Sequence, residues 1–522
     1  MTNGIPHRGI PFFVADDVRY NFSVYDVVRK GMPTSMRQGF DNEKYIELQA
    51  ANIRKRIAQF GGKLYLEFGG KLFDDYHASR VLPGFEPDTK FRMLESLVDD
   101  VEIVIAINAN HIEKGKTRGD LGIPYDEDVL RLIDVFRSRG FLVGSVVLTQ
   151  YANQPAADAY RHRLEQLGVT CRLHYPIAGY PHDIERIVSD DGYGKNEYIE
   201  TTRPLGPGSG KMATCLSQLY HEHQRGIDAG YAKYETFPIW NLPLNHPVNI
   251  AYEAATVDLD DANIIDPFHL EAYGETTVNY NRDVEAFPVL KAMMERIMGE
   301  SPYQSPTDMG VNMAGYAIVD DDACRDAARL EIVRRYFAAA VHLKRTGTGE
   351  EQVERLRSIM NRAGVTPDLS PARAVALEKE AATGAPAGAM VLPDGHVVTG
   401  KTGDLLGAAS ALLMHALKAV TGVDETIPVI DDAAIEPICR LKTEHLNSVN
   451  RRLHSDETLI ALSITSATSP VAARVIDGLK QLRGCDAFFS VIISSTDEAL
   501  YRKLGINVCC EPKYERVSLY HR

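Results

Sequence analysis

The alternation of short apolar segments with amphipathic ones between residues 42 and 175 constrains this fold more than any other feature. Residues 42–60 place apolar side chains at spacings of three and four, as an amphipathic helix requires. Strand-like runs follow at residues 63–68, 101–108, 141–149 and 169–175, with helical segments at 127–139 and 156–167. Continuous apolar strands are typical of parallel sheets covered on both faces. The sequence therefore predicts an α/β fold with βαβ units in a doubly wound parallel sheet.

The pattern changes after about Tyr231. Short segments rich in Pro, Asn and aromatic residues indicate an irregular α+β region, and residues 321–379 favour helix almost throughout. Ala381–Met390 has the composition of a linker, and AMVLPDGHVVTG after it predicts a hairpin, followed by helices and a strand at Phe488–Ser495. We expect an N-terminal extension (1–35), a phosphate-loop-like α/β domain (36–235), an α+β middle domain (236–320), a helical subdomain (321–385) and a C-terminal α/β subdomain (386–522).

Charge and cysteine content narrow the partners and the compartment. Lys plus Arg total 57 against 71 for Asp plus Glu, a net charge of −14, which repels nucleic acid and anionic lipid. Seven cysteines without a paired framework favour free thiols in a reducing, cytoplasmic compartment. Neither a signal peptide nor a run of about 18 apolar residues is found. We expect a small phosphorylated molecule as ligand, with no nucleic-acid or membrane partner, and a homo-oligomer.

One glycine-rich segment has a recognisable ligand chemistry. Gly206, Gly208, Ser209, Gly210 and Lys211 precede a run with apolar residues at helical spacing. Glycines let backbone N–H groups turn inward, the helix N-terminus adds partial positive charge, and the lysine supplies a full charge. The segment therefore predicts a phosphate-binding loop. The alternative is a glycine-rich helix start whose lysine faces solvent; we favour phosphate because three glycines there cost backbone entropy.

The segment departs from the Walker pattern G-x-x-x-x-G-K-[ST] in two places. Leu205 stands where the first glycine is expected, and Met212 stands where a hydroxyl would ligate Mg²⁺. Thr214 or Ser209 could replace that hydroxyl only at a non-standard spacing. The preceding YIETTRPL is not a clear apolar strand, and Pro204 suits a strand end poorly. ATP or another nucleotide fits the loop, whereas Mg²⁺ lacks its usual ligand.

Polar residues after the predicted strands are further candidates. In open α/β sheets ligands bind beyond the carboxyl ends of the strands. If the sheet is parallel, these loops form one cationic cleft with the glycine loop; the alternative is that surface loops are polar in any case. We expect Lys211, Arg80 and Asp75 to be catalytic. We expect the substrate to be bound by Lys71, His77, Arg118, Asp308 and Asn312.

For other polar groups, a purely structural role explains the sequence at least as well as a role in ligand binding. Asp308 and Asn312 flank Met309-Gly310, an approach suited to substrate, but Ser305–Asp308 equally fits a turn or cap. Arg282 could pair with a phosphate or belong to a salt-bridged loop. His445 and His454 lack companions at metal-ligand spacing, and we interpret them as satisfied or solvent-facing. The sequence predicts no metal site.

Segments spread over most of the chain carry a family resemblance. They include GFDNEKY, KLYLEFGGKLFDDYHASRVLPGFEPDTK, RGDLGI, GSVVLTQY, IVSDDGYGKNEYIETTRPL, GPGSGKMATCLSQLYHEH, FPIWNLPLNHPVN, DPFHLEAYGETTVNYNRDVE and SPTDMGVNMAG. From about Met36 to the C-terminus the sequence resembles the uncharacterised bacterial family 0371, or domain of unknown function 1846. The resemblance implies the α/β core, the phosphate loop and a C-terminal subdomain similar in topology to cytidine deaminases. Family members carry a short apolar strand before the glycine loop, whereas here Gly206 follows Leu205 directly.

The resemblance does not imply an activity. Some members have been labelled ATP-dependent peptidases, but His221-Glu222-His223 is not H-E-x-x-H, because the second histidine must fall one helical turn later. Deaminase chemistry needs a P-C-x-x-C pair, which neither Cys439 nor Cys509-Cys510 provides. Two classes stay open: a phosphoryl-transfer or ligase-type enzyme, and a non-catalytic nucleotide sensor or scaffold.

Overall fold

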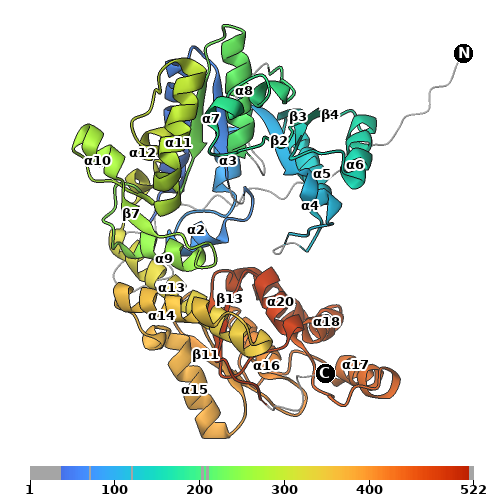
Figure 1. Cartoon of the computed structure of the whole chain (residues 1–522). Coiled ribbons are helices and arrows are strands. Elements are labelled where there is room, and N and C mark those ends of the chain that lie inside the picture. The colour runs from blue at the N-terminus through green and yellow to red at the C-terminus, as the bar shows by residue number, and fades with distance from the viewer. Residues whose placement is uncertain (1–36, 70–71, 119–121, 202–204, 207–210, 516–522) are drawn as a thin grey trace, which may run out of the picture.

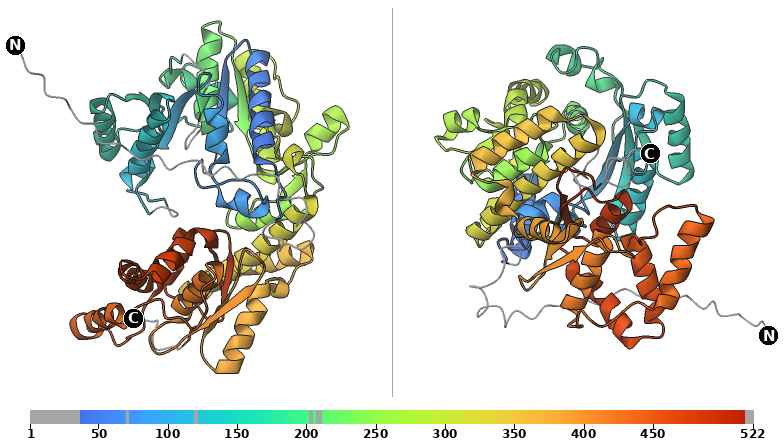
Figure 2. Two further views of the ribbon diagram at one scale, coloured as in Figure 1. Left: turned by 180° about the vertical axis from the view of Figure 1, so that it is seen from behind. Right: turned by 90° about the horizontal axis from the view of Figure 1, so that it is seen from below.

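The chain forms two regions, each around its own β-sheet, and helix α13 (Asp321–Thr346) lies where they meet (Figure 1). The computed structural model describes residues 37–69, 72–118, 122–201, 205–206 and 211–515. Both views in Figure 2 show the same two regions, with α13 and α14 (Glu350–Ala363) along the side where they connect. No helix in these ranges is both long and apolar enough to cross a membrane.

The first region contains a seven-stranded sheet in which every described pair is parallel. Its strand order is β4-β3-β2-β5-β1-β6-β9. The parallel α/β fold predicted from the apolar runs is confirmed. The strands are β1 (Leu64–Phe68), β2 (Glu102–Asn108), β3 (Leu142–Thr149), β4 (Thr170–Leu173), β5 (Leu205–Gly206), β6 (Gly230–Tyr234) and β9 (Gly310–Val311).

Helices cover both faces of this sheet. Tyr234 meets the hydroxyl of Tyr45 on α1 (Asn42–Gln59) at 2.7 Å, so α1 lies on one face. Tyr65 donates to Glu222 on α8 (Lys211–Gln224) at 2.6 Å, so α8 lies on the other. Because neighbouring strand residues point to opposite faces, each strand must be apolar on both sides. Further helices of this region are α2 (Tyr76–Val81), α3 (Thr89–Glu95), α4 (Ala109–Glu113), α5 (Tyr125–Ser138), α6 (Pro155–Gln166), α7 (Ile184–Ile187), α9 (Pro247–Ala255), α10 (Pro267–Tyr273), α11 (Asn281–Met298) and α12 (Pro306–Met309).

The strand before the glycine loop corrects the sequence interpretation, which found no strand there. Leu205 and Gly206 form β5, between β1 and β2 at the centre of the sheet. The strand is only two residues long: Leu205 pairs with Tyr65 and Glu102, and Gly206 with Ile103. One apolar residue next to a glycine is too short a pattern to predict a strand. Leu205 and Gly206 form a strand only because β1 and β2 pair with them on either side.

The second region is built on a mixed sheet of order β11-β10-β12-β13. The predicted hairpin is confirmed, since β10 (Ala387–Val391) and β11 (Val397–Lys401) pair antiparallel. The predicted strand Phe488–Ser495 is only partly correct. Strand β12 is Asp486–Phe489, and the chain then leaves the sheet because Ser494 caps α20 (Ser495–Lys503). Strand β13 (Asn507–Cys510) follows, parallel to β12.

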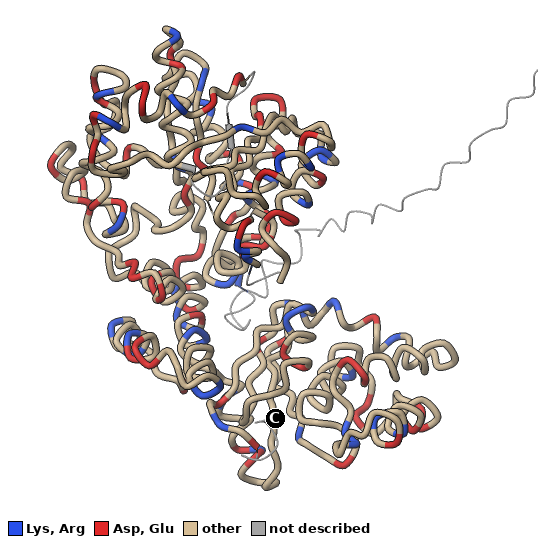
Figure 3. Tube along the Cα trace, turned by 45° about the vertical axis from the view of Figure 1, so that its right-hand side comes forward, with Lys and Arg blue, Asp and Glu red and all other residues tan. Residues whose placement is uncertain are grey.

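The remaining helices pack around this second sheet. Three residues separate the end of helix α15 (Pro371–Thr383) from β10, and the helix ends within the segment predicted as a linker. Charged residues of both signs are interspersed over both regions (Figure 3). The other helices of this region are α16 (Ala408–Val420), α17 (Asp432–Arg440), α18 (Ser455–Ser466) and α19 (Pro470–Asp477).

Candidate functional site

The glycine loop connects a central strand to a helix. Gly206 ends β5, and Lys211 is the first residue of α8. Gly208, Ser209 and Gly210 lie outside the described residues, and so does Lys71. Glu222, near the end of α8, accepts hydrogen bonds from Lys63 and Tyr65 at the amino end of β1. Eleven residues of helix span about 16 Å, so α8 begins towards the carboxyl edge of the sheet.

A polar cluster occupies the same face of the sheet. Glu67 of β1 is paired in register with Lys233 of β6, and both have the strand parity of Tyr65, which points at α8. The Lys233 ammonium contacts Glu235 Oε1 at 2.8 Å and Asp283 Oδ2, on α11, at 2.5 Å. The Tyr231 hydroxyl donates to Glu67 at 2.7 Å. Three carboxylates and one ammonium group therefore meet on the face of the sheet that α8 covers.

The protonation of this cluster is perturbed by burial. Burial would lower the pKa of Lys233, but Glu235 and Asp283 outweigh it and raise that pKa. Burial raises the pKa of Glu235 to about 7; Lys233 opposes the shift and Asp283 adds to it. Glu235 Oε2 has no hydrogen-bond partner among the described residues, and neither has the buried Trp240 Nε1. A carboxyl that changes protonation near neutral pH is suited to acid–base work.

Comparisons with known proteins place the chain in a family. Residues 38–364 match the family described as domain of unknown function DUF1846, N-terminal, and residues 368–520 match its C-terminal counterpart. A UPF0371 protein of Corynebacterium diphtheriae is 58% identical over 93% of this chain and 99% of its own length. The chain belongs to this family. A UPF0371 protein of Corynebacterium efficiens is 57% identical and one of Streptococcus pneumoniae 54% identical, each over 93% of this chain and 100% of its own length.

The family resemblance inferred from sequence is thus confirmed, and the family description states no activity. Among solved structures, the ADP form of the Aeropyrum pernix ORC2 protein is similar at 12% identity, over 86% of this chain and 94% of that one. Its TM-score is 0.14. A similarity this low carries no argument about fold or ligand.

In this UPF0371 chain, Asp75, His77 and Arg80 lie together at α2. Asp75 caps α2 by accepting from Ala78 N at 3.1 Å, and it pairs with Lys90 at 2.6 Å. Arg80 lies 3.1 Å, and His77 3.7 Å, from Glu331 of α13. Burial lowers the pKa of His77. All three side chains thus face partners within the chain, and their predicted roles in catalysis and substrate binding stay predictions.

The other predicted residues are distributed more widely. Arg118 pairs with Asp128 at 2.7 Å and lies 3.7 Å from Asp74. Asn312 is buried and donates to the carbonyl oxygens of Thr236 and Pro238. Thr214 is buried in the first turns of α8. The structure does not bring these side chains to one point, and their roles in ligand binding stay predictions.

Asp308 lies at the amino edge of the sheet, because α12 directly precedes β9. Its carboxylate accepts from Ser305 N at 3.1 Å as part of a capping box, and from the Tyr273 hydroxyl at 2.9 Å. It also lines a cavity of about 270 Å³ beside Lys55 and Arg56. The cap that the sequence offered as the alternative is therefore present.

Sequence reasoning missed Glu67, Lys233 and Glu235. Lys233 and Glu235 alternate with Tyr234 in a segment that ends a strand, and charged residues on an otherwise buried strand are the signal that could have found them. Within the described ranges, no group of three or more His, Cys, Asp or Glu side chains could hold a metal ion.

Proposed function

We propose that this chain binds the phosphate groups of a nucleotide or a phosphorylated small molecule at the N-terminus of α8. The observation that carries the proposal is the strand–glycine segment–helix connection at the centre of a parallel sheet, where β5 leads to α8. A helix N-terminus offers unpaired N–H groups and partial positive charge to an anion. Lys211 supplies the full charge, and Gly206, Gly208, Ser209 and Gly210 supply the close backbone approach.

The neighbouring cluster supports phosphoryl transfer or a ligase reaction as the chemistry. Lys211 would neutralise charge that develops on the transferred group, and Glu235, with a pKa of about 7, would accept a proton from the attacking hydroxyl or amine. A second candidate, a non-catalytic nucleotide sensor, is favoured by Met212, which stands where a magnesium-binding hydroxyl is expected.

Binding is tested by calorimetry with inorganic phosphate, ATP, GTP and a sugar phosphate. We expect Lys211→Ala to weaken the best of these ligands by roughly tenfold or more, since it removes a charge-assisted contact. Lys344→Ala is the matched control, because it removes the same charge from an exposed position on α13. Equal affinity in wild type and Lys211→Ala would remove the loop from the function.

Turnover separates the two candidates. The enzyme releases a product from the bound nucleotide when phosphoryl acceptors are supplied, and Glu235→Gln lowers that rate more than it lowers affinity. The sensor releases the nucleotide unchanged. Met212→Thr sharpens the distinction, because restoring the hydroxyl should make ATP binding tighter when Mg²⁺ is present. A nucleotide affinity that does not respond to Mg²⁺ in this variant would argue against phosphate binding in the Walker manner.

A further inference from the structure

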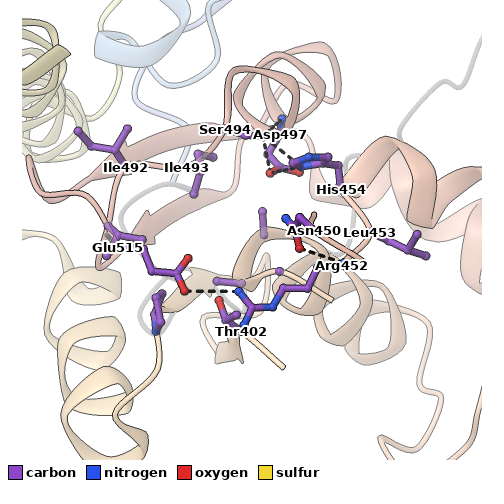
Figure 4. A pocket seen from close by; sticks show the side chains of 15 residues that line it. Thr402, Asn450, Arg452, Leu453, His454, Ile492, Ile493, Ser494, Asp497 and Glu515 are labelled. Atoms are coloured by element: carbon purple, nitrogen blue, oxygen red, sulfur yellow. Dashed lines mark hydrogen bonds and ion pairs between the residues drawn. The ribbon is translucent and has the colours of Figure 1, made fainter. Parts of the chain in front are cut away.

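The second region contains a cavity of about 70 Å³ beyond the carboxyl end of β12 (Figure 4). Strands β12 and β13 are parallel and connected by α20, so this is the edge at which α/β units bind ligands. This volume is large enough for several water molecules or a small anionic group. Separate stretches of chain line it, represented by Pro386, Gly407, His454, Ser494 and Glu515.

A histidine oriented by a carboxylate forms one side of this cavity. Asp497 Oδ2 lies 3.2 Å from Nδ1 of His454, and Asp497 Oδ1 accepts from both the backbone N–H and the hydroxyl of Ser455, at 2.8 and 2.6 Å. Because a carboxylate only accepts, Nδ1 of His454 is the donor and Nε2 carries the lone pair. The contacts of the ring with Asp497 and with Ser494 are both made by Nδ1. Nε2 is the ring nitrogen left to accept a hydrogen bond, and His454 lines the cavity.

The protonation of the pair agrees with this arrangement. The hydrogen bond to Asp497 raises the pKa of His454, against the effect of burial. Burial would raise the pKa of Asp497, but hydrogen bonds from His454, Ser455 and Ser494 outweigh it and lower that pKa. Asp497 therefore stays ionised and can stabilise a positive charge on His454 when the ring takes up a proton.

A salt bridge between Arg452 and Glu515 lies across the cavity from this pair. Figure 4 shows Arg452 and Glu515 on one side, joined at 3.4 Å, with His454, Asp497 and Ser494 on the other. Helix α16 also begins at the cavity: its N-cap Gly407 offers no side-chain cap, and a Cβ placed there would meet nothing within 4 Å. Its first N–H groups and Arg452 can therefore bind an anion together.

Long-range hydrogen bonds hold the walls in position. The Ser410 hydroxyl, on α16, donates to Leu453 O at 2.8 Å, and the Tyr501 hydroxyl, on α20, donates to Ala409 O at 2.7 Å. Lys442 donates to Arg452 O at 2.5 Å. Helices α16, α18 and α20 all begin at the cavity, and these hydrogen bonds fix their starts relative to one another, as a preorganised site requires.

A serine-type triad does not describe this site. The Ser494 hydroxyl donates to Asp497 at 2.7 Å and lies 3.3 Å from Nδ1 of His454, the side already used by the carboxylate. A nucleophilic serine would have to face Nε2. Ser494 is therefore not placed as the nucleophile of a triad.

We propose that this cavity is a second ligand site, separate from the glycine loop. It takes a small molecule that carries both an anionic oxygen group and a hydroxyl group. Arg452 and the first N–H groups of α16 bind the anion, and the hydroxyl donates its hydrogen bond to Nε2 of His454. Asp497 holds the ring in the orientation that leaves Nε2 available for this hydrogen bond.

The test uses the full chain carrying Lys211→Ala, so that the glycine loop contributes less to the measured binding. Binding is measured by calorimetry with two probes, inorganic phosphate and glycolate, which distinguish a phosphate from a carboxylate ligand. We expect at least one of them to bind, and His454→Gln and Arg452→Gln each to weaken it by roughly tenfold. His445→Gln is the control, since that exposed histidine does not line the cavity.

Three results would overturn the proposal. The first is no binding of either probe at about 10 mM. The second is equal affinity in the parent protein and both cavity variants, and the third is an equal loss in His445→Gln. Should His454→Gln fail to fold, Arg452→Gln still decides, because Arg452 is partly exposed at the cavity rim. Failure here leaves the glycine loop untouched, because the Lys211 experiment does not involve this cavity.

Discussion

Glu331 and Asp497 are two carboxylates surrounded by donors, one at the joint between the regions and one at the C-terminal cavity. Glu331 accepts from Arg334 and Arg335, each at 2.8 Å, and its side chain is 1% exposed. Asp497 accepts from Ser455, Ser494 and His454. Burial would raise the pKa of both carboxyls, and in both the donors lower it.

The two carboxylates differ in the further contacts that their hydrogen-bond donors make. Arg334 spans from Glu331 to Asp486 at the start of β12, and the ring of His77 packs against Phe237 and Tyr252. These groups hold α2, α13 and β12 together. The ring of His77 leaves Nε2 buried without a hydrogen-bond partner among the described residues, whereas His454 lines a cavity. A perturbed pKa is therefore common to a structural joint and to a site, and the cavity beside the ring distinguishes them.

The largest expected effect concerns the joint. Glu331→Gln should lower the free energy of unfolding by about 3–5 kcal/mol, because it removes the buried carboxylate that three half-buried arginines share. The pKa of Glu331 is well below its usual 4.5, so its contribution is present above about pH 4.5 and is lost as the pH falls through the lower value. Urea unfolding monitored at pH 7 and at pH 4 measures both effects.

The control for the joint is Glu354→Gln, which breaks the exposed pair with Arg357 on α14. That change should cost about 0.5 kcal/mol or less. If Glu331→Gln lowered the free energy of unfolding no more than Glu354→Gln does, the cluster around Glu331 would not hold the two regions together. Glu331 would then not be a structural counterpart of Asp497.

An intermediate case is Glu235, which is buried like Glu331 but has one oxygen without a partner. Its pKa is raised from the usual 4.5 to about 7, so the folded state binds its proton more tightly than the unfolded state. That contribution is full below pH 4.5 and is lost as the pH rises through 7. Glu235→Gln, which stays neutral, should therefore gain about 1–3 kcal/mol relative to wild type between pH 5 and pH 8.

The measurement for Glu235 is the unfolding free energy of both proteins across that pH range. Glu425→Gln serves as the control, because Glu425 is exposed and its variant should run parallel to wild type. A constant difference between Glu235→Gln and wild type would mean that Glu235 stays ionised beside Lys233, and it could not then act as the proton acceptor proposed for it.

The sequence predicted what local periodicity encodes. The strands β1 to β4 and the hairpin of β10 and β11 follow from apolar runs and a Pro-Asp-Gly turn. The two-residue β5 could not be predicted, because its pairing depends on Tyr65 and Glu102, far away in the chain. The strand Phe488–Ser495 was drawn too long because the apolar pattern does not reveal that Ser494 caps a helix.

Ion pairs between residues far apart in the sequence were as hard to predict as the pairing of β5. The residues of the glycine loop are consecutive in the sequence, so the sequence alone predicts a phosphate-binding function for them. His454 and Asp497 are 43 residues apart in the sequence. Arg80 on α2 and its partner Glu331 on α13 are likewise far apart in the sequence. Sequence shows which side chains can ionise but not which carboxylate each cation will meet. That pairing is set by tertiary packing.

The smallest expected effect concerns His454 itself. Its pKa is raised above the usual 6.5, so its pairing with Asp497 contributes stability that is complete below about pH 6.5 and is lost as the pH rises through the raised value. His454→Gln should cost less than about 1 kcal/mol at pH 6, because the side chain is 36% exposed and solvent screens the pair. The cost should shrink towards pH 8. A loss of several kcal/mol at every pH, as large as that of Glu331→Gln, would show that His454 is a structural group like those around Glu331, and the cavity beside it would lose its proposed hydrogen-bond acceptor.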